Sequence, residues 1–137
     1  MFCDLCYEVY DGSLIKSEFG FCPKAQCGGE LHVVDELLMP AIIELNKKGY
    51  ITNYCCSGHY YSDADEQTGR QHTYISFCAE ECTPDFENLP AGFTVDDGGT
   101  VIRKWRSRLQ GKNLFADILN TAQELYTWAL ELEAYPY

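Results

Sequence analysis

Basic residues are scarce in this chain, which has 10 Lys and Arg against 21 Asp and Glu and a formal net charge of -11. Proteins that coat DNA or RNA without sequence preference neutralise phosphates with many Lys and Arg side chains. The charge balance therefore argues against a general nucleic-acid coat protein. An acidic surface of this kind suits a basic protein partner instead.

Long hydrophobic runs are also missing, and no stretch approaches the length needed to span a membrane. The first residues, MFCDLCYEVYDG, lack the basic start and the continuous apolar core of a signal peptide. We therefore expect a cytoplasmic protein with no membrane partner. In such a reducing compartment the eight cysteines are expected to bind metal or stay free, because disulfides are rare there.

Familiar catalytic motifs are missing as well. The sequence has no Walker loop, dinucleotide fingerprint or Gly-x-Ser-x-Gly elbow, and no internal repeat or low-complexity linker. His32 and His72 have no spacing that defines a catalytic set. No reaction can be named from these residues, so whether the protein is an enzyme stays open.

The strongest signal that is present comes from four cysteines near the start. Two residues separate Cys3 from Cys6, and four separate Cys22 from Cys27. A tight turn with this spacing can supply two thiolates to one tetrahedral zinc ion, and two such turns complete the site. We predict a zinc ribbon over residues 1-34, in which zinc is structural because four thiolates leave no open position for a substrate.

The fold class predicted for the whole chain is α+β, with the zinc ribbon followed by a small mixed α/β domain over residues 35-137. Apolar spacing predicts a helix that begins near Leu38 or Met39, ends at Gly49 and holds Pro40 in its first turn. A long C-terminal helix is predicted from Asn113 to about Ala134. Extended segments are predicted at 7-21 around a turn at Asp11-Gly12, at 31-34, 50-55 and 72-78, and as a hairpin of 93-96 with 100-105.

A second group of versatile residues, Cys55-Cys56-Ser57-Gly58-His59, directly follows a predicted strand. A Ser-Gly turn at a strand end can present backbone N–H groups to an anion, and His59 could act as general base, phosphate partner or metal ligand. We therefore assign Cys56, Ser57, Gly58 and His59 to a ligand-binding site. The alternative is a tight turn whose cysteines point into the core while His59 caps a carbonyl.

Five of the ten basic residues fall between positions 103 and 112, and Trp105 lies among them. Guanidinium groups beside an aromatic ring suit phosphate contact and base stacking, so Arg103 and Arg106 are added to the predicted ligand site. In a strand, however, Arg103 and Arg106 would lie on opposite faces. Local pairing with the abundant carboxylates is the alternative.

Three residues separate Cys78 from Cys82, and the two could join Cys56 with His59 or His72 in a second metal site. This spacing is less specific than that of the first four cysteines. Free cysteine is also often buried as a small hydrophobic residue. Both interpretations stay open at this point.

Two family resemblances concern the middle of the chain. The stretch from Cys22-Pro23 through Cys27-Gly28-Gly29-Glu30-Leu31 and Leu45-Asn46-Lys47-Lys48-Gly49-Tyr50 to Cys55-Cys56-Ser57-Gly58-His59 resembles uncharacterised small proteins of bacteria and their prophages. That resemblance implies no activity. The helix, strand and Cys56-Ser57-Gly58 turn also look faintly like the tRNA wybutosine-synthesis methyltransferase family, whose motif continues with arginine where this chain has His59.

Three functions are therefore compared. The first is a binding module that holds a phosphate-bearing ligand or a nucleic-acid end near the Cys56–His59 turn. The second is an acidic phage-type interaction or inhibitor factor that occupies a basic protein partner. The third is an enzyme of RNA or nucleotide modification that depends on Cys56 or His59.

Overall fold

The computed structural model describes residues 1-14, 20-58, 72-78, 88-104 and 111-135. Within these ranges the chain is a mixed α+β protein with two helices and two antiparallel sheets, which agrees with the predicted class. Three residues with predicted roles lie outside the described ranges: His59, Cys82 and Arg106. No described helix is both long and apolar enough to cross a membrane.

The larger sheet has four antiparallel strands in the order β3-β4-β6-β5. These are β3 (Thr52–Cys56), β4 (His72–Phe77), β5 (Thr94–Val95) and β6 (Thr100–Lys104). The predicted hairpin is confirmed as β5 and β6, whose register pairs Val95 with Val101. β4 alternates strictly, with Thr73, Ile75 and Phe77 buried, as a strand covered on one face should.

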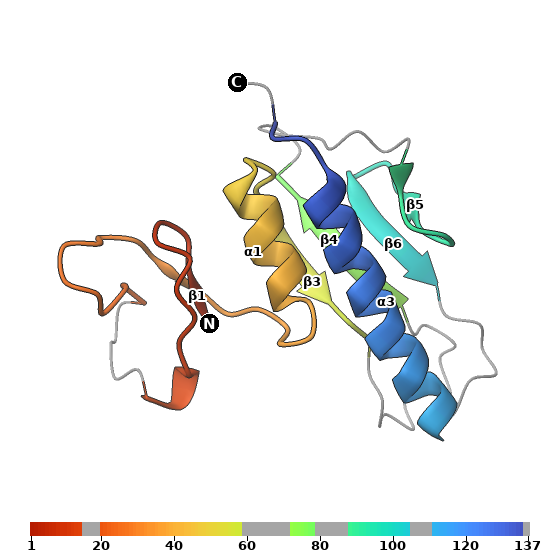
Figure 1. Cartoon of the computed structure of the whole chain (residues 1–137), viewed down its shortest axis with the longest axis horizontal. Helices are drawn as coiled ribbons and strands as arrows, with labels where there is room; N and C mark the ends of the chain where they lie inside the picture. The colour runs from red at the N-terminus through yellow and green to blue at the C-terminus, as the bar shows by residue number, and fades with distance from the viewer. Residues whose placement is uncertain (15–19, 59–71, 79–87, 105–110, 136–137) are drawn as a thin grey trace.

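Two helices cover that buried face, α1 (Met39–Lys47) and α3 (Gly111–Glu131), and they lie side by side (Figure 1). α1 begins where the sequence predicts, with Pro40 in its first turn, and it ends before Gly49, which has a φ of 90°. α3 begins two residues before Asn113 and ends three before Ala134. The helices and strands enclose a core that includes Leu38, Ile42, Leu45, Ile75, Val101, Leu125, Trp128 and Ala129.

Lys48 joins the ends of the two helices. From the C-cap of α1, its Nζ donates to the carbonyl oxygens of Ala129, Leu130 and Leu132 at 2.8, 2.7 and 2.6 Å. The last carbonyls of a helix have no partner within the helix and carry partial negative charge. A partly buried ammonium group therefore caps α3, while the Tyr50 hydroxyl donates to the Glu133 carbonyl at 3.0 Å close by.

The N-terminal segment lies beside α1 and forms the second sheet (Figure 1). β1 (Phe2–Cys3) pairs with β2 (Leu31–His32), which is shorter than the predicted strand at 31-34. At the predicted turn the chain forms a short 3-10 helix, η1 (Gly12–Leu14). The Asp11 carboxylate stabilises it by accepting hydrogen bonds from the N–H and hydroxyl of Ser13. Phe2 is buried in the same core as α1 and α3, so this segment is anchored to the helices.

Candidate metal centre

The side chains of Cys3, Cys6, Cys22 and Cys27 converge in the N-terminal segment. Their sulfur atoms all lie within 4.8 Å of one another, with Cys3 Sγ 3.6 Å from Cys27 Sγ and Cys6 Sγ 3.8 Å from Cys22 Sγ. Cys3 is fully buried, and the other three are partly buried. The structure thus brings together the four residues that the spacing singled out.

These separations test whether a metal fits. Thiolates at about 2.3 Å from a tetrahedral zinc ion lie about 3.8 Å apart, whereas the two sulfurs of a disulfide lie about 2.05 Å apart. The observed 3.6 and 3.8 Å match the tetrahedron and exclude the disulfide. The group can therefore hold a metal ion, and all four cysteines would be its ligands.

Backbone groups reinforce the two cysteine turns. The N–H of Cys6 donates to Cys3 Sγ at 3.5 Å, and the N–H of Tyr7 donates to the Cys3 carbonyl at 3.0 Å. Tyr7 and Gln26 adopt positive φ values of 58° and 65°, which is the cost of curling the chain tightly around sulfur. The backbone thus holds the Cys3 sulfur in place within the first turn.

Gly29 is required where the chain passes the sulfur cluster. A Cβ atom at this position would lie 2.5 Å from Cys3 Sγ and 2.8 Å from Asp4 Oδ1. Both distances are far below van der Waals contact. Gly29 thus allows the backbone to pass close to the sulfur atoms. Gly28 has a different role, because it adopts a positive φ of 70°.

Tyr10 adds a hydroxyl group to the cluster. Its Oη lies 3.2 Å from Cys22 Sγ and 3.1 Å from Glu8 Oε2. Burial opposes ionisation of Cys22, but the hydrogen bonds from Tyr10 and from the N–H of Lys24 outweigh it and lower the pKa of Cys22 to about 7. The bond to Cys22, together with burial, raises the pKa of Tyr10, so Tyr10 stays a neutral donor.

The pKa values of Cys22 and Cys27 shift in opposite directions. The N–H of Gly29 favours the Cys27 thiolate, but burial and the neighbouring thiols outweigh it and raise the pKa of Cys27 to about 12. Without a metal, the cluster therefore keeps protons that a bound ion would displace. Lys24 lies on the second turn, and its Nζ pairs with Glu8 Oε1 at 2.5 Å.

The Cys56-Ser57-Gly58 turn, predicted to receive an external anion, contacts an internal one. Asp35 Oδ2 accepts from the Ser57 N–H at 2.9 Å and from the Ser57 hydroxyl at 2.7 Å. The N–H of Gly58 points to Cys56 Sγ at 3.4 Å, and Thr73 Oγ1 donates to the Ser57 carbonyl at 2.9 Å. Ser57 is 4% exposed, so these groups face the protein.

Arg103 lies on β6 and faces α3. Its guanidinium group donates to Thr121 Oγ1 at 2.9 Å and lies 3.4 Å from Glu124 Oε2 and 3.6 Å from Asp117 Oδ1. The pairing with carboxylates that the sequence offered as the alternative is therefore observed for this residue. In the sheet, Arg103 pairs with Thr73 of β4, whose hydroxyl donates to the Ser57 carbonyl, so one strand separates Arg103 from the Cys56-Ser57-Gly58 turn.

The other predicted ligands do not form a second cluster within the described ranges. Cys56, Cys78 and His72 are not part of any group of three metal-ligating side chains there. A different group of side chains that could hold a metal ion, which no sequence pattern predicted, is formed by Asp4, Glu30 and His32. Asp4 directly follows β1, and Glu30 directly precedes β2. Cross-strand pairing brings them together, and residue spacing alone gives no signal for it.

The chain matches no protein-family model, and neither a curated protein nor a solved structure resembles it at a significant level. Function therefore has to be inferred from the geometry and charge of the residues described above.

Proposed function

We propose that this protein is an acidic protein-interaction factor, in which structural zinc holds the N-terminal ribbon and the carboxylate surface binds a basic protein partner. Four thiolates around one ion would leave no open coordination position, which supports a structural role for the metal. Zinc suits this site because it accepts four thiolates in tetrahedral geometry. The same ion would supply the folding free energy that so short a segment lacks.

The observation that carries the proposal is that the Asp35 carboxylate accepts hydrogen bonds from both the N–H and the hydroxyl of Ser57. A phosphate-bearing ligand at this turn would need the N–H and hydroxyl groups that the Asp35 carboxylate already accepts. It would also approach that carboxylate closely, and two anions repel at short range. The geometry therefore favours the interaction factor over the phosphate-binding module.

The described surface has unbalanced negative charge. Four Lys and Arg residues have described side chains, and all four are engaged within the protein: Lys24 with Glu8, Lys47 over the Tyr7 ring, Lys48 at the end of α3, and Arg103 with two carboxylates. Exposed carboxylates without a Lys or Arg partner among the described residues include Asp4, Glu30, Glu36, Glu131 and Glu133. These carboxylates are available to a basic partner.

Native mass spectrometry followed by affinity capture tests the proposal. We expect one zinc per chain, lost in the Cys6→Ser variant and retained in Cys78→Ser. The zinc-loaded protein, immobilised at low salt, should capture proteins with basic surfaces that are released as salt rises, because exposed charges are screened. A purified partner whose affinity does not depend on salt would contradict the acidic-surface proposal.

A further inference from the structure

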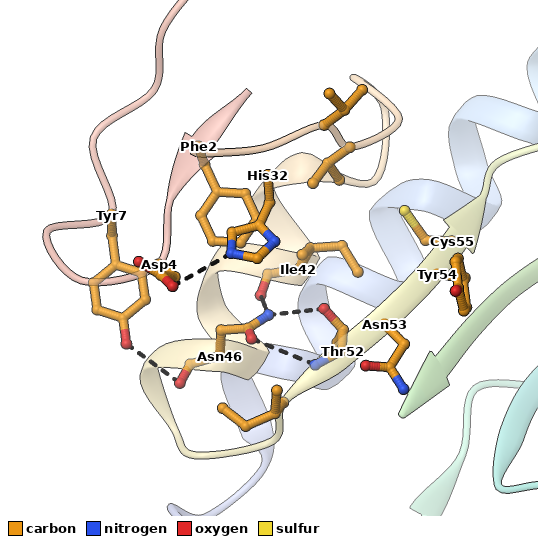
Figure 2. A pocket seen from close by; sticks show the side chains of 13 residues that line it. Phe2, Asp4, Tyr7, His32, Ile42, Asn46, Thr52, Asn53, Tyr54 and Cys55 are labelled. Atoms are coloured by element: carbon orange, nitrogen blue, oxygen red, sulfur yellow. Dashed lines mark hydrogen bonds and ion pairs between the residues drawn. The ribbon is translucent and has the colours of Figure 1, made fainter. Parts of the chain in front are cut away.

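A cavity of about 360 Å³ lies between the N-terminal segment and the sheet (Figure 2). Phe2, Asp4 and His32 line one side, Ile42 and Asn46 of α1 line another, and Thr52–Cys55 of β3 line the third. β3 is an edge strand of the four-stranded sheet, so no described strand pairs with its side opposite β4. The cavity therefore opens where an edge strand meets a cysteine-bearing module.

We propose that this groove is the docking site for an extended segment of a partner protein, in which a large apolar residue lies close to a Lys or Arg. The inference rests on the proposed function, since it names the place where a basic partner binds. It specifies both ends of the contact, an apolar anchor and a cation.

The apolar end is marked by large hydrophobic side chains in contact with solvent. Val33 is 80% exposed and Tyr54 is 73% exposed, and both line the cavity together with Ile51. Exposed apolar side chains that are scattered singly need no explanation, but a group around one cavity marks an interaction site. Burying an aromatic ring such as Tyr54 supplies much of the binding energy in many protein interfaces.

The cationic end is marked by Asp4 and Glu30. Asp4 Oδ1 accepts the N–H of Glu30 at 2.8 Å, and Asp4 Oδ2 lies 3.3 Å from His32 Nε2. The Glu30 carboxylate lies in the same group and has no Lys or Arg partner among the described residues. A Lys or Arg of a partner would find two carboxylates there, which is the charge complementarity that selects a basic segment.

Hydrogen bonds at the strand edge indicate how the segment would bind. Asn46 Oδ1 accepts the N–H of Thr52 at 3.4 Å, and Asp35 accepts the N–H of Ser57. These two side chains cover outward-facing N–H groups near both ends of β3, which protects the edge from full strand pairing. The segment would therefore be recognised mainly by its side chains. Asn53, directly after Thr52, has no partner in the register with β4.

The test selects peptides from a displayed library of random linear sequences on the zinc-loaded protein at low salt. Selected peptides are then measured by fluorescence anisotropy against Tyr54→Ser, Val33→Ser and Glu30→Gln. Matched controls are Leu130→Ser and Asp97→Asn, which remove an exposed apolar side chain and an exposed carboxylate away from the groove. Zinc content and circular dichroism verify that every variant is folded.

We expect selected sequences that pair a large apolar residue with a Lys or Arg. Tyr54→Ser should weaken their binding about 10-fold or more, while the control variants stay within about 2-fold of the original protein. Basic peptides that bind Tyr54→Ser and Val33→Ser with full affinity would overturn the groove but leave the acidic-surface function standing. If no basic peptide is selected, both proposals fail. If the original protein then self-associates and Tyr54→Ser does not, the groove is assigned to a second copy of the chain.

Discussion

Asp35 and Ser57 are joined through a single carboxylate oxygen, which accepts both the backbone N–H and the hydroxyl of Ser57 at 2.9 and 2.7 Å. The two residues are 22 positions apart, one before α1 and the other after β3. The other oxygen of Asp35 accepts the N–H of Leu37 at 3.0 Å. One side chain therefore fixes both the approach to α1 and the end of β3.

Asp35→Ala is expected to destabilise the protein by about 1-3 kcal/mol, because it leaves the N–H and hydroxyl of the buried Ser57 without a partner. Glu36→Ala is the control, since Glu36 is exposed and its change should cost less than about 0.5 kcal/mol. Urea unfolding of both variants measures the difference. Equal midpoints would show that the carboxylate contributes nothing to stability.

The same residue decides whether the turn can take an external anion. Inorganic phosphate added to the original protein should leave the amide NMR signals of Ser57 and Gly58 unchanged, because Asp35 already occupies the Ser57 donors. Potassium chloride at matched ionic strength is the control. Saturable shifts at these two amides with phosphate alone would favour the phosphate-binding module over the interaction factor.

Gly29→Ala is expected to weaken metal binding strongly, because the added Cβ would lie 2.5 Å from Cys3 Sγ and force a ligand to move. Gly12→Ala is a matched control, since its nearest neighbour would be Met1 Sδ at an ordinary 3.6 Å. Competition with a chromophoric zinc chelator measures both affinities. Similar affinities for the two variants would place Gly29 away from the metal site in solution.

Tyr10→Phe should make the metal site more sensitive to acid. The hydrogen bond from Tyr10 helps to lower the pKa of Cys22 to about 7, so its removal raises the pKa and lets protons compete with the metal at higher pH. The pH at which half of the zinc is lost should therefore increase. Tyr54→Phe removes a distant hydroxyl and should not change this pH, which is read from zinc release to a colorimetric indicator.

Lys48→Met is expected to destabilise the protein by about 1-3 kcal/mol, because three carbonyl oxygens at the end of α3 lose a charged donor. Methionine keeps much of the apolar stem, so the change isolates the ammonium group. Lys47→Met is the adjacent control, where an exposed contact with the Tyr7 ring contributes about 0.5 kcal/mol. If the two variants unfolded at the same urea concentration, the cap would have no energetic role.

Local patterns predicted most of the elements. The start of α1 follows from Pro40, its end from Gly49, and the β5–β6 hairpin from the turn at 96-99, because each depends on neighbouring residues. The four cysteines also formed a group, since each pair is close in sequence. The chain also turns after Asp11, as predicted, but through the short 3-10 helix Gly12–Leu14, because Asp11 accepts hydrogen bonds from Ser13.

Contacts between distant residues could not be predicted in this way. Asp35 with Ser57, Lys48 with the end of α3, and Tyr10 with Cys22 each depend on how separate elements meet. Arg103 is an instructive case, because its charge suggested a ligand while its place on the face of β6 that meets α3 gives it Thr121 and two carboxylates. The face of the strand on which a charged residue lies thus decides whether its side chain makes internal contacts or is open to a ligand.

Phe2 connects the N-terminal segment, whose contacts join residues fairly close in sequence, to a core whose contacts join residues far apart in sequence. Cys3 and Cys27 are 24 positions apart, whereas Lys48 reaches Leu132 across 84 positions. On the ribosome, the four cysteines emerge before most of the sheet and long before α3, and segments that can fold early do so as synthesis proceeds. Metal loading can therefore precede the burial of Phe2, which leaves an aromatic side chain in water until the last helix has been made.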